Sequence, residues 1–412
     1  MSLPPTLSKS RIALLKSGSA STTPLPRVLR PARAAPSDAV RPTRAEINLA
    51  NVRHNLRVVQ RAAGSAKVYC VLKADAYGHG AKALARTLER AGAEGICVAL
   101  LEEALELRQA GIQLPILVMG GYYGRAAGEL LRHQLTPVIH DPEQLHVLAE
   151  EVRYAGEQRF GVHLKIDTGM GRLGILPEQV QRVAALLRQY PELRLDGLMT
   201  HFACADSADV ESLDHQLDAF DASTAELAAL GHAPSIRHAA NSAALFKVER
   251  AKLDLVRPGL ALYGVEPIVG SAPELKPAMR VQTQLVATRA LRSGQSVGYG
   301  STWTAQRPST IATIPIGYAD GLPRSLSNRG AVLVRGQRAP IVGLVSMDMT
   351  MIDVTDIEGA RVGDECVILG SQRGPHGLAC ISAHDLATEL GTIPWEVLTN
   401  ISRRVPRFYR EP

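Results

Sequence analysis

Between residue 68 and about residue 260, short apolar runs alternate with segments whose apolar residues recur every three or four positions. The short runs predict buried strands, and the longer spacing predicts helices. Eight runs predict strands: VYCVL at 68, ICVAL at 96, ILVM at 116, TPVI at 136, VHLKI at 162, GLMTHF at 197, SIRHA at 235 and LDLVRPGLALYG from 253. Eight strand-helix units in this length predict an α/β fold, an N-terminal (β/α)8 TIM-type barrel.

The pattern changes after about residue 275, where the helical spacing disappears. Strand-like runs follow, separated by Gly, Pro, Asn and Asp turns: VQTQLVATRAL, STIATIPIG, AVLVRG, APIVGLV, MTMIDV and DECVILG. They predict a mostly antiparallel C-terminal β domain, to which EINLA at 45–49 is a candidate further strand. We therefore expect the barrel over residues 45–270 and the β domain over residues 271–412.

The basic charge of the chain is concentrated at its start. Residues 1–44 carry eight Lys and Arg and one acid, a net charge of +7, so the rest of the 412 residues carries 6 − 7 = −1. A nearly neutral body predicts no face for nucleic acid. The leader is rich in Ser, Pro, Ala and Arg, which favours a disordered basic tail or a mis-assigned start, with an organelle transit peptide as the alternative.

Other features of composition place the protein among globular proteins. The chain is 46% hydrophobic and 21% charged, and it has no apolar run of the roughly 20 residues that cross a membrane. Its five cysteines are scattered and form no CxxC pair, which predicts a reducing compartment and a cytoplasmic location.

Polar residues gather where the predicted barrel strands end. Barrel enzymes carry their active sites at these carboxyl ends. Each residue alone has an ordinary structural explanation, as a cap, a turn or a solvated exit, but together they predict one site: Lys73, Asp167, Arg172, His201, Asn241, Ser242, Arg257 and Gly259.

Two parts of this rim suggest a cofactor. ANSA at 240 and RPGLALYG at 257 lie after the seventh and eighth strands, where barrels commonly bind a phosphate. Lys73 lies at the end of the first strand, where a partly desolvated amine is able to react with an aldehyde. An aldehyde and a phosphate in one molecule predict pyridoxal 5'-phosphate as the cofactor.

At this point the sequence resembles the alanine racemases, fold-type III pyridoxal-phosphate enzymes, from about residue 45 to residue 409. The resemblance rests on motifs in one order: KADAYGHG at 73, LKIDTGMGRLG at 164, THFACAD at 200, ANSAA at 240, VRPGLALYG at 256, VGYGSTWTA at 297, IPIGYADG at 314, SMDM at 346 and ISRRVPR at 401. It implies interconversion of L- and D-alanine, supply of D-alanine for peptidoglycan, and a homodimer with shared active sites.

The resemblance also implies roles for individual residues. Lys73 would hold the cofactor and act as the base on the D-alanine side, and Tyr299 from a partner subunit would be the base on the L-alanine side. Removing a proton from one face of a planar carbon and returning one to the other requires two groups on opposite sides. Arg172 and the backbone of Met347 would hold the substrate.

The remaining implied roles concern the cofactor. Arg257 would face the ring nitrogen, and its permanent charge would discourage protonation there. His238 would support Arg257, and His201 would lie behind Tyr299. The phosphate would be held by Tyr77, Ser242, Gly259, Leu260 and the backbone around them, and Asn241, in the same loop, would also belong to the cofactor site.

Three further positions concern the breadth of substrates and a possible lysine modification. Arg403 stands where many members have a tyrosine beside the phosphate, and Ser346 where some have cysteine; both bear on substrate breadth. Lys165 matches a lysine that is carbamylated in some members.

Other functions remain as alternatives. GMGRLG at 169, with Asp196 further on, satisfies a dinucleotide-binding pattern and would predict a nicotinamide dehydrogenase. A non-catalytic pyridoxal-phosphate carrier and a serine or broader-specificity racemase are the others within this chemistry. We predict no metal site, since the spacing of one further candidate group matches no compact ligand set: His201, Cys204, Asp206 and His215.

Overall fold

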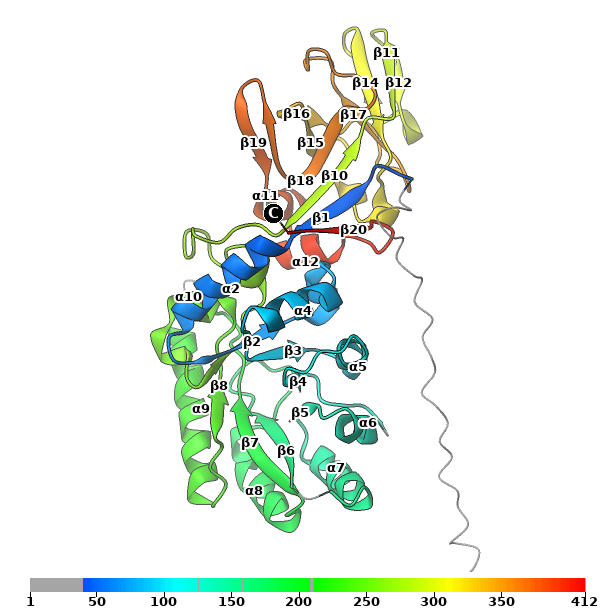
Figure 1. Ribbon diagram of the computed structural model, residues 1–412. Coiled ribbons are helices and arrows are strands. Elements are labelled where there is room, and N and C mark those ends of the chain that lie inside the picture. The colour runs from blue at the N-terminus through cyan, green and yellow to red at the C-terminus, as the bar shows by residue number, and fades with distance from the viewer. Residues whose placement is uncertain (1–39, 125, 158, 208–210, 412) are drawn as a thin grey trace, which may run out of the picture.

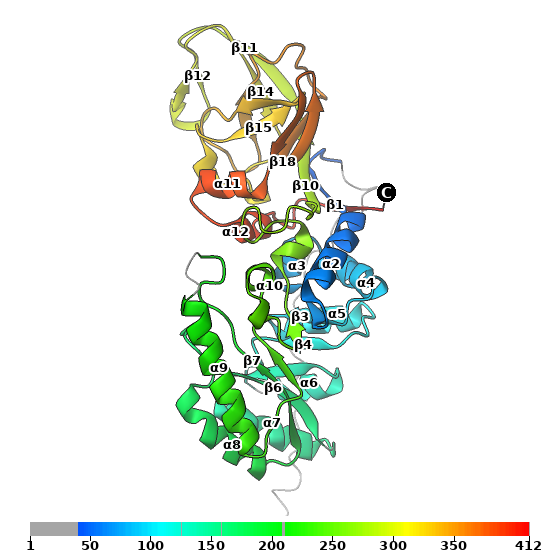
Figure 2. The same ribbon diagram turned by 90° about the vertical axis from the view of Figure 1, so that its left-hand side faces the viewer.

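The computed structural model describes residues 40–411 apart from 125, 158 and 208–210. The predicted leader therefore lies almost entirely outside the described residues. A helix-ringed barrel and a second domain of β-sheets meet at one end of the barrel (Figures 1 and 2). The fold class predicted from the sequence is confirmed.

Eight parallel strands form the barrel, in the order β8-β7-β6-β5-β4-β3-β2-β9. Backbone hydrogen bonds from Asp254 N to Arg237 O (3.1 Å) and from Arg257 N to Ala240 O (2.9 Å) join the two ends of this order and nearly close the barrel. All eight predicted strands are present: β2 Lys67–Val71, β3 Gly95–Val98, β4 Ile116–Val118, β5 Thr136–Ile139, β6 Phe160–Lys165, β7 Leu193–Met199, β8 Ile236–His238 and β9 Leu255–Val256.

Helices follow the strands and cover the outside of the barrel (Figure 1). Their starts have local causes: Asp141 accepts a hydrogen bond from Glu143 N, and Pro142 opens α7 with a backbone angle that suits a helix. The helices are α2 Leu49–Ala63, α3 Lys73–Tyr77, α4 Ala81–Arg90, α5 Leu101–Gln109, α6 Ala127–Arg132, α7 Pro142–Tyr154, α8 Val180–Gln189, α9 Glu211–Ala229 and α10 Ser242–Lys247.

The second domain contains three sheets. The largest has the order β16-β15-β18-β10-β1-β20, with β19 paired to β18; the smaller sheets are β11-β14-β17 and β12-β13. Strand β1, the EINLA segment, pairs with β10 antiparallel and β20 parallel. The strands are β1 Arg44–Asn48, β10 Met279–Gln284, β11 Ala287–Leu291, β12 Ser296–Val297, β13 Trp303–Thr304, β14 Ser309–Ile314, β15 Ala331–Val334, β16 Gln337–Pro340, β17 Thr350–Asp353, β18 Glu365–Gly374, β19 Gly377–Ile381 and β20 Arg407–Arg410.

The structure differs from the sequence prediction in four local features. Strand β16 ends at Pro340, so it includes only the first two residues of the predicted run APIVGLV. The run VQTQLVATRAL divides into β10 and β11, which belong to different sheets. The LALY part of the last barrel run forms a 3-10 helix, η4 Leu260–Tyr263. Two helices, α11 Ala383–Leu390 and α12 Pro394–Thr399, lie in the β domain, the first capped by Ser382.

One continuous core of buried apolar side chains runs from the barrel into the β domain. It includes Val68 and Ile96 from the barrel strands and Val281 and Val367 from the large sheet. Within the described residues, no helix is both long and apolar enough to span a bilayer.

Candidate active site

Lys73 opens an unusual turn at the end of β2. The next four residues all have positive φ: Ala74 (52°), Asp75 (54°), Ala76 (56°) and Tyr77 (48°). Hydrogen bonds from Ala76 N to Leu72 O (2.9 Å) and from Gly78 N to Ala74 O (3.0 Å) make this a left-handed helical turn. Left-handed backbone costs an L-residue about 1–2 kcal/mol, so the surroundings must impose the turn.

Two carboxylates hold the turn in place. Glu103 of α5 accepts hydrogen bonds from Ala74 N (2.6 Å) and Ala99 N (2.9 Å), which joins the turn to the end of β3. Asp75 accepts one from Ala81 N (2.8 Å), at the start of α4. The position of the lysine is therefore fixed by contacts to the helix of its own strand-helix unit, α4, and to the next unit, β3 and α5.

The surroundings of Lys73 favour its reactive, neutral form. Burial lowers the pKa of its ammonium group, and the positive charge of Arg172 lowers it further, against a smaller opposing effect of Glu103. An amine with a lowered pKa is a better nucleophile at neutral pH.

A small polar recess beside this turn is suited to an anion. Ser242 Oγ accepts hydrogen bonds from Gly259 N (2.9 Å) and Ala261 N (3.3 Å), so its own proton is left to donate. A Cβ on residue 259 would lie only 2.6 Å from the Tyr77 hydroxyl, so only glycine allows the backbone to come this close to the phenol. Two hydroxyl donors beside a backbone that carries no side chain suit a phosphate group.

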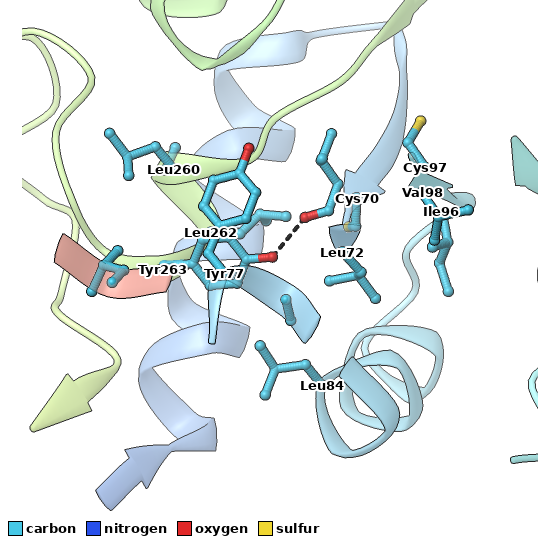
Figure 3. Close-up of a cluster of buried hydrophobic side chains, with 14 of the residues drawn as sticks. Cys70, Leu72, Tyr77, Leu84, Ile96, Cys97, Val98, Leu260, Leu262 and Tyr263 are labelled. Carbon is cyan, nitrogen blue, oxygen red and sulfur yellow. Dashed lines mark hydrogen bonds between the residues drawn. The ribbon is translucent and has the colours of Figure 1, made fainter. Parts of the chain in front are cut away.

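Packing fixes the Tyr77 ring at this recess. Its centroid lies 4.8 Å from that of Tyr263, whose hydroxyl donates a hydrogen bond to Val71 O (2.6 Å) (Figure 3). Burial raises the pKa of Tyr77, so its phenol stays protonated and remains a donor. Leu260 is buried beside the recess, and Asn241 caps α10 by accepting a hydrogen bond from Ala244 N (3.0 Å).

Arg257 is a buried cation in the barrel mouth. Its guanidinium donates to Thr200 O (2.8 Å), Ala239 O (2.9 Å) and His238 Nδ1 (2.6 Å). Burial lowers its pKa to about 10, so it still carries a positive charge at neutral pH. These bonds do not use its Nε–H, which remains for a ligand.

The contact with Arg257 dictates the protonation of two histidines. Because a guanidinium only donates, His238 Nδ1 must accept, and the proton of His238 lies on Nε2. That nitrogen is 2.8 Å from His163 Nδ1, which must accept in turn. Both rings are therefore neutral, in agreement with the direction of their pKa values, which burial lowers, to about 4 for His163.

This neutral pair predicts acid sensitivity. Below pH about 6.5 the unfolded chain protonates residue 163 while the folded chain does not, so folding stability should fall between pH 6.5 and 4, by up to about 3 kcal/mol. We expect a His163→Gln variant to lose less stability than the native protein between pH 7 and pH 5, as measured by urea unfolding. Parallel losses would contradict the neutral assignment.

Arg172 and His201 lie on neighbouring loops after β6 and β7. Asp167 accepts hydrogen bonds from the backbone N–H of Gly169 (3.1 Å) and Met170 (2.9 Å), which curls the loop that ends in an exposed Arg172. His201 is half-buried, and burial followed by the charge of Arg257 lowers its pKa to about 3.

Sequence reasoning missed the residue that ties these loops together. Gln216 of α9 donates to Thr168 Oγ1 (3.1 Å) and His201 O (3.2 Å) and accepts from Ala203 N (3.0 Å). Thr168 and Thr200 are joined through their hydroxyl oxygens at 2.7 Å. A polar residue in an amphipathic helix carries no sequence signal for such a contact. His163 was missed because its partner, His238, is 75 positions away in the sequence and no local pattern joins the two.

The structure also shows the surroundings of Arg403, Lys165 and Ser346. Arg403 is exposed and lines a cavity of about 280 Å3 beside α3, together with Asp75 and Glu103. Lys165 is buried, and burial with the charge of Arg172 lowers its pKa to about 8. Ser346 lies in the β domain and accepts a hydrogen bond from Tyr318 N (3.0 Å) through its carbonyl oxygen.

Tyr299 and Met347 are not brought to this site within one chain. They belong to the β domain, and their exposed fractions are 72% and 52%. Tyr299 begins a short 3-10 helix between β12 and β13. Strand β12 lies in the β domain, apart from the barrel in both views (Figures 1 and 2).

The geometry argues against the dinucleotide-binding alternative. GMGRLG follows the fifth barrel strand and leads into a loop that curls around Asp167, whereas dinucleotide binding requires a direct turn into a helix on an open sheet. No group of three or more His, Cys, Asp or Glu side chains in the described part of the chain is arranged to hold a metal ion.

Comparisons with known proteins agree with the architecture. The family model "Alanine racemase, N-terminal domain" matches residues 47–267, and "Alanine racemase, C-terminal domain" matches residues 278–409. The alanine racemase of Sorangium cellulosum is 58% identical over 379 residues, covering 90% of this chain and all of that protein.

Solved structures give the same result. Alanine racemase from Bartonella henselae, with covalently bound pyridoxal phosphate, has a TM-score of 0.80 and 31% identity, covering 89% of this chain and 99% of that one. The enzyme from Bacillus anthracis, with bound L-Ala-P, has a TM-score of 0.84 and 33% identity, covering 90% and 95%. With both family models matched along nearly all of its described length, this chain belongs to the alanine racemase family.

Proposed function

We propose that the protein is a pyridoxal-phosphate-dependent alanine racemase that interconverts L- and D-alanine in the cytoplasm and so supplies D-alanine for peptidoglycan. The observation that carries the proposal is Lys73, an amine with a lowered pKa, beside a recess suited to a phosphate. Its cysteines are all free, which supports a reducing compartment.

The residues present fit the cofactor. Lys73 would bind it covalently, and Tyr77 and Ser242 would donate hydrogen bonds to its phosphate, in the space left by Gly259. Leu260 would border the phosphate, and Asn241 would shape the loop. Bound there, the cofactor would acidify the α-proton of the amino acid by withdrawing electrons from the α-carbon.

Two side chains would then transfer protons on opposite faces of the α-carbon. In the L-to-D direction Tyr299 Oη would take the α-proton from one face, and Lys73 Nζ would return a proton to the other. Tyr299 belongs to the β domain and not to the barrel that carries Lys73, so we propose that it enters from a partner subunit in a homodimer. His201 would lie behind it.

Other residues would set orientation and charge. Arg172 and the backbone of Met347 would hold the substrate carboxylate. Arg257 would direct its remaining Nε–H at the cofactor ring nitrogen, supported by His238. Since Arg257 keeps its own proton, it would leave that nitrogen unprotonated and limit side reactions.

A direct assay tests the function. The purified protein should be yellow, and it should convert L-alanine to D-alanine and the reverse, measured by circular dichroism of the amino acid. A colourless protein that cannot be reconstituted would contradict the proposal. Serine belongs in the same assay, because Arg403 lines the cavity beside the Lys73 turn. Comparable rates on serine and alanine would favour the broader-specificity racemase.

Subunit mixing tests the shared site. A Lys73→Ala subunit and a Tyr299→Phe subunit are each expected to be inactive alone. A mixed dimer contains one site with both bases intact, so random pairing should restore roughly a quarter of native activity. Absence of activity despite proven subunit exchange would contradict a site shared between subunits. Restored activity would also argue against a non-catalytic carrier.

A further inference from the structure

Asp320 is a buried carboxylate in the β domain, in the short 3-10 helix Tyr318–Asp320 after β14. Its side chain is completely buried, and that of Arg41 is 29% exposed. Both terminal nitrogens of Arg41 donate hydrogen bonds to this carboxylate, one to Oδ2 at 2.9 Å and one to Oδ1 at 2.8 Å. A buried carboxylate is costly unless it is paired with a cation. Arg404 Nε also lies 3.4 Å from Oδ1, so Arg41, with its two shorter hydrogen bonds, makes the stronger of the two contacts that hold this segment.

The Asp320 segment holds Met347. Tyr318 N donates to Ser346 O (3.0 Å), and Ala319 N donates to Met347 O (3.1 Å). A Cβ on Gly317 would lie 2.2 Å from Ser346 O, so the two segments are in close backbone contact. The Asp320 carboxylate also accepts a hydrogen bond from Gly317 N (3.1 Å). Any shift of Asp320 would therefore be passed to the Met347 backbone.

Arg41 comes from a distant part of the chain, just before β1. It also donates to Arg404 O (3.3 Å), and Arg404 in turn pairs with Asp348 (2.6 Å), the neighbour of Met347. Three segments far apart in the sequence thus meet around one carboxylate. A guanidinium suits this place because its planar fork makes two parallel hydrogen bonds, which lysine cannot make.

We propose that Arg41 is a positioning residue for substrate binding: through Asp320 it fixes the Met347 backbone that reaches the active site of the partner subunit. This inference rests on the proposed function. It gives the first described residues of the chain a role in a site that another subunit completes.

Steady-state kinetics test the inference in the full-length holoenzyme. For Arg41→Ala we expect the KM for alanine to rise about tenfold with kcat within about twofold, as for a weakened contact to bound substrate. Arg41→Lys should restore part of the loss. The matched control is Arg53→Ala, which breaks an exposed pair with Glu411 (3.0 Å) and should leave both constants unchanged.

Mixed dimers separate positioning from general destabilisation. In the first mixture, one chain carries Arg41→Ala and Lys73→Ala, and the other carries Tyr299→Phe. The one complete site of this dimer takes its Met347 from the Arg41→Ala chain, so its KM should be raised. In the second mixture, one chain carries Arg41→Ala and Tyr299→Phe, and the other carries Lys73→Ala. The one complete site of this dimer takes its Met347 from the chain with native Arg41, so its KM should be normal. Equal KM values in the two mixtures would overturn the proposal.

Hydrogen exchange gives a readout that does not depend on activity. The amides of Tyr318 and Ala319 should exchange faster in Arg41→Ala than in the native protein, because their bonds to the Met347 segment weaken. Unchanged exchange would overturn the inference even if the kinetics changed. An inactive native protein would contradict the proposed function instead, and the exchange result would still decide whether Arg41 holds this segment.

Discussion

The Lys73→Ala variant is expected to be colourless and to lose alanine racemisation by at least about 10⁴-fold. The loss should be this large because the variant lacks both the covalent attachment of the cofactor and one of the two proton-transferring groups. Borohydride treatment of the native protein, followed by mass spectrometry of its peptides, should place the reduced cofactor on residue 73. No label should be found in the variant.

The matched control for this experiment is Lys67→Ala. Lys67 is an exposed lysine at the first position of the same strand, β2. It should keep full colour and activity, because its side chain lies at the opposite end of the strand from the site. Label found on another lysine of the native protein would show that Lys73 has been given the wrong role.

Tyr299→Phe is expected to damage the two directions unequally. The change removes only the phenolic hydroxyl and leaves Lys73 untouched, so proton abstraction from L-alanine should fall by about 10²- to 10⁴-fold. Exchange of the α-proton of D-alanine with solvent deuterium should be partly spared, because Lys73 acts on that face. Deuterium incorporation, followed separately for each enantiomer, measures the difference.

Tyr154→Phe provides the control. Tyr154 is exposed to a similar extent, 83% against 72% for Tyr299, but it is the last residue of α7 on the outside of the barrel, and loss of its hydroxyl should change neither direction. Equal losses for both enantiomers in Tyr299→Phe would mean that the phenol only positions the substrate. A one-base mechanism through Lys73 would then replace the two-base mechanism.

The barrel could be predicted because its signals are local. Each strand is a short apolar run, and the helices between them have apolar faces of the usual period, so the eight units could be counted from the sequence. The division of VQTQLVATRAL at Leu285 and Val286 could not be found in this way. It depends on which partners β10 and β11 acquire, β18 for one and β14 for the other.

In the candidate site, too, the features with a local sequence signal could be predicted and the long-range contacts could not. Lys73, Ser242 and Gly259 were predicted because they stand at strand ends, where barrels carry their chemistry. Their roles, and that of Tyr299, came from the resemblance and remain predictions. The pairing of Arg41 with Asp320 joins residues that are 279 positions apart, and no local pattern indicates such a contact.

The left-handed turn after Lys73 has a consequence for protein engineering. Four L-residues in this conformation would cost roughly 4–8 kcal/mol in total, comparable to the whole folding stability of many domains. An achiral glycine at Ala74 would relieve part of that cost in the folded state, although it would also add entropy to the unfolded chain. The present sequence therefore has a lower folding stability than the same fold would have without this turn. Variants selected for heat resistance are expected to carry substitutions at Ala74, at the risk of making the position of the Lys73 amine less fixed.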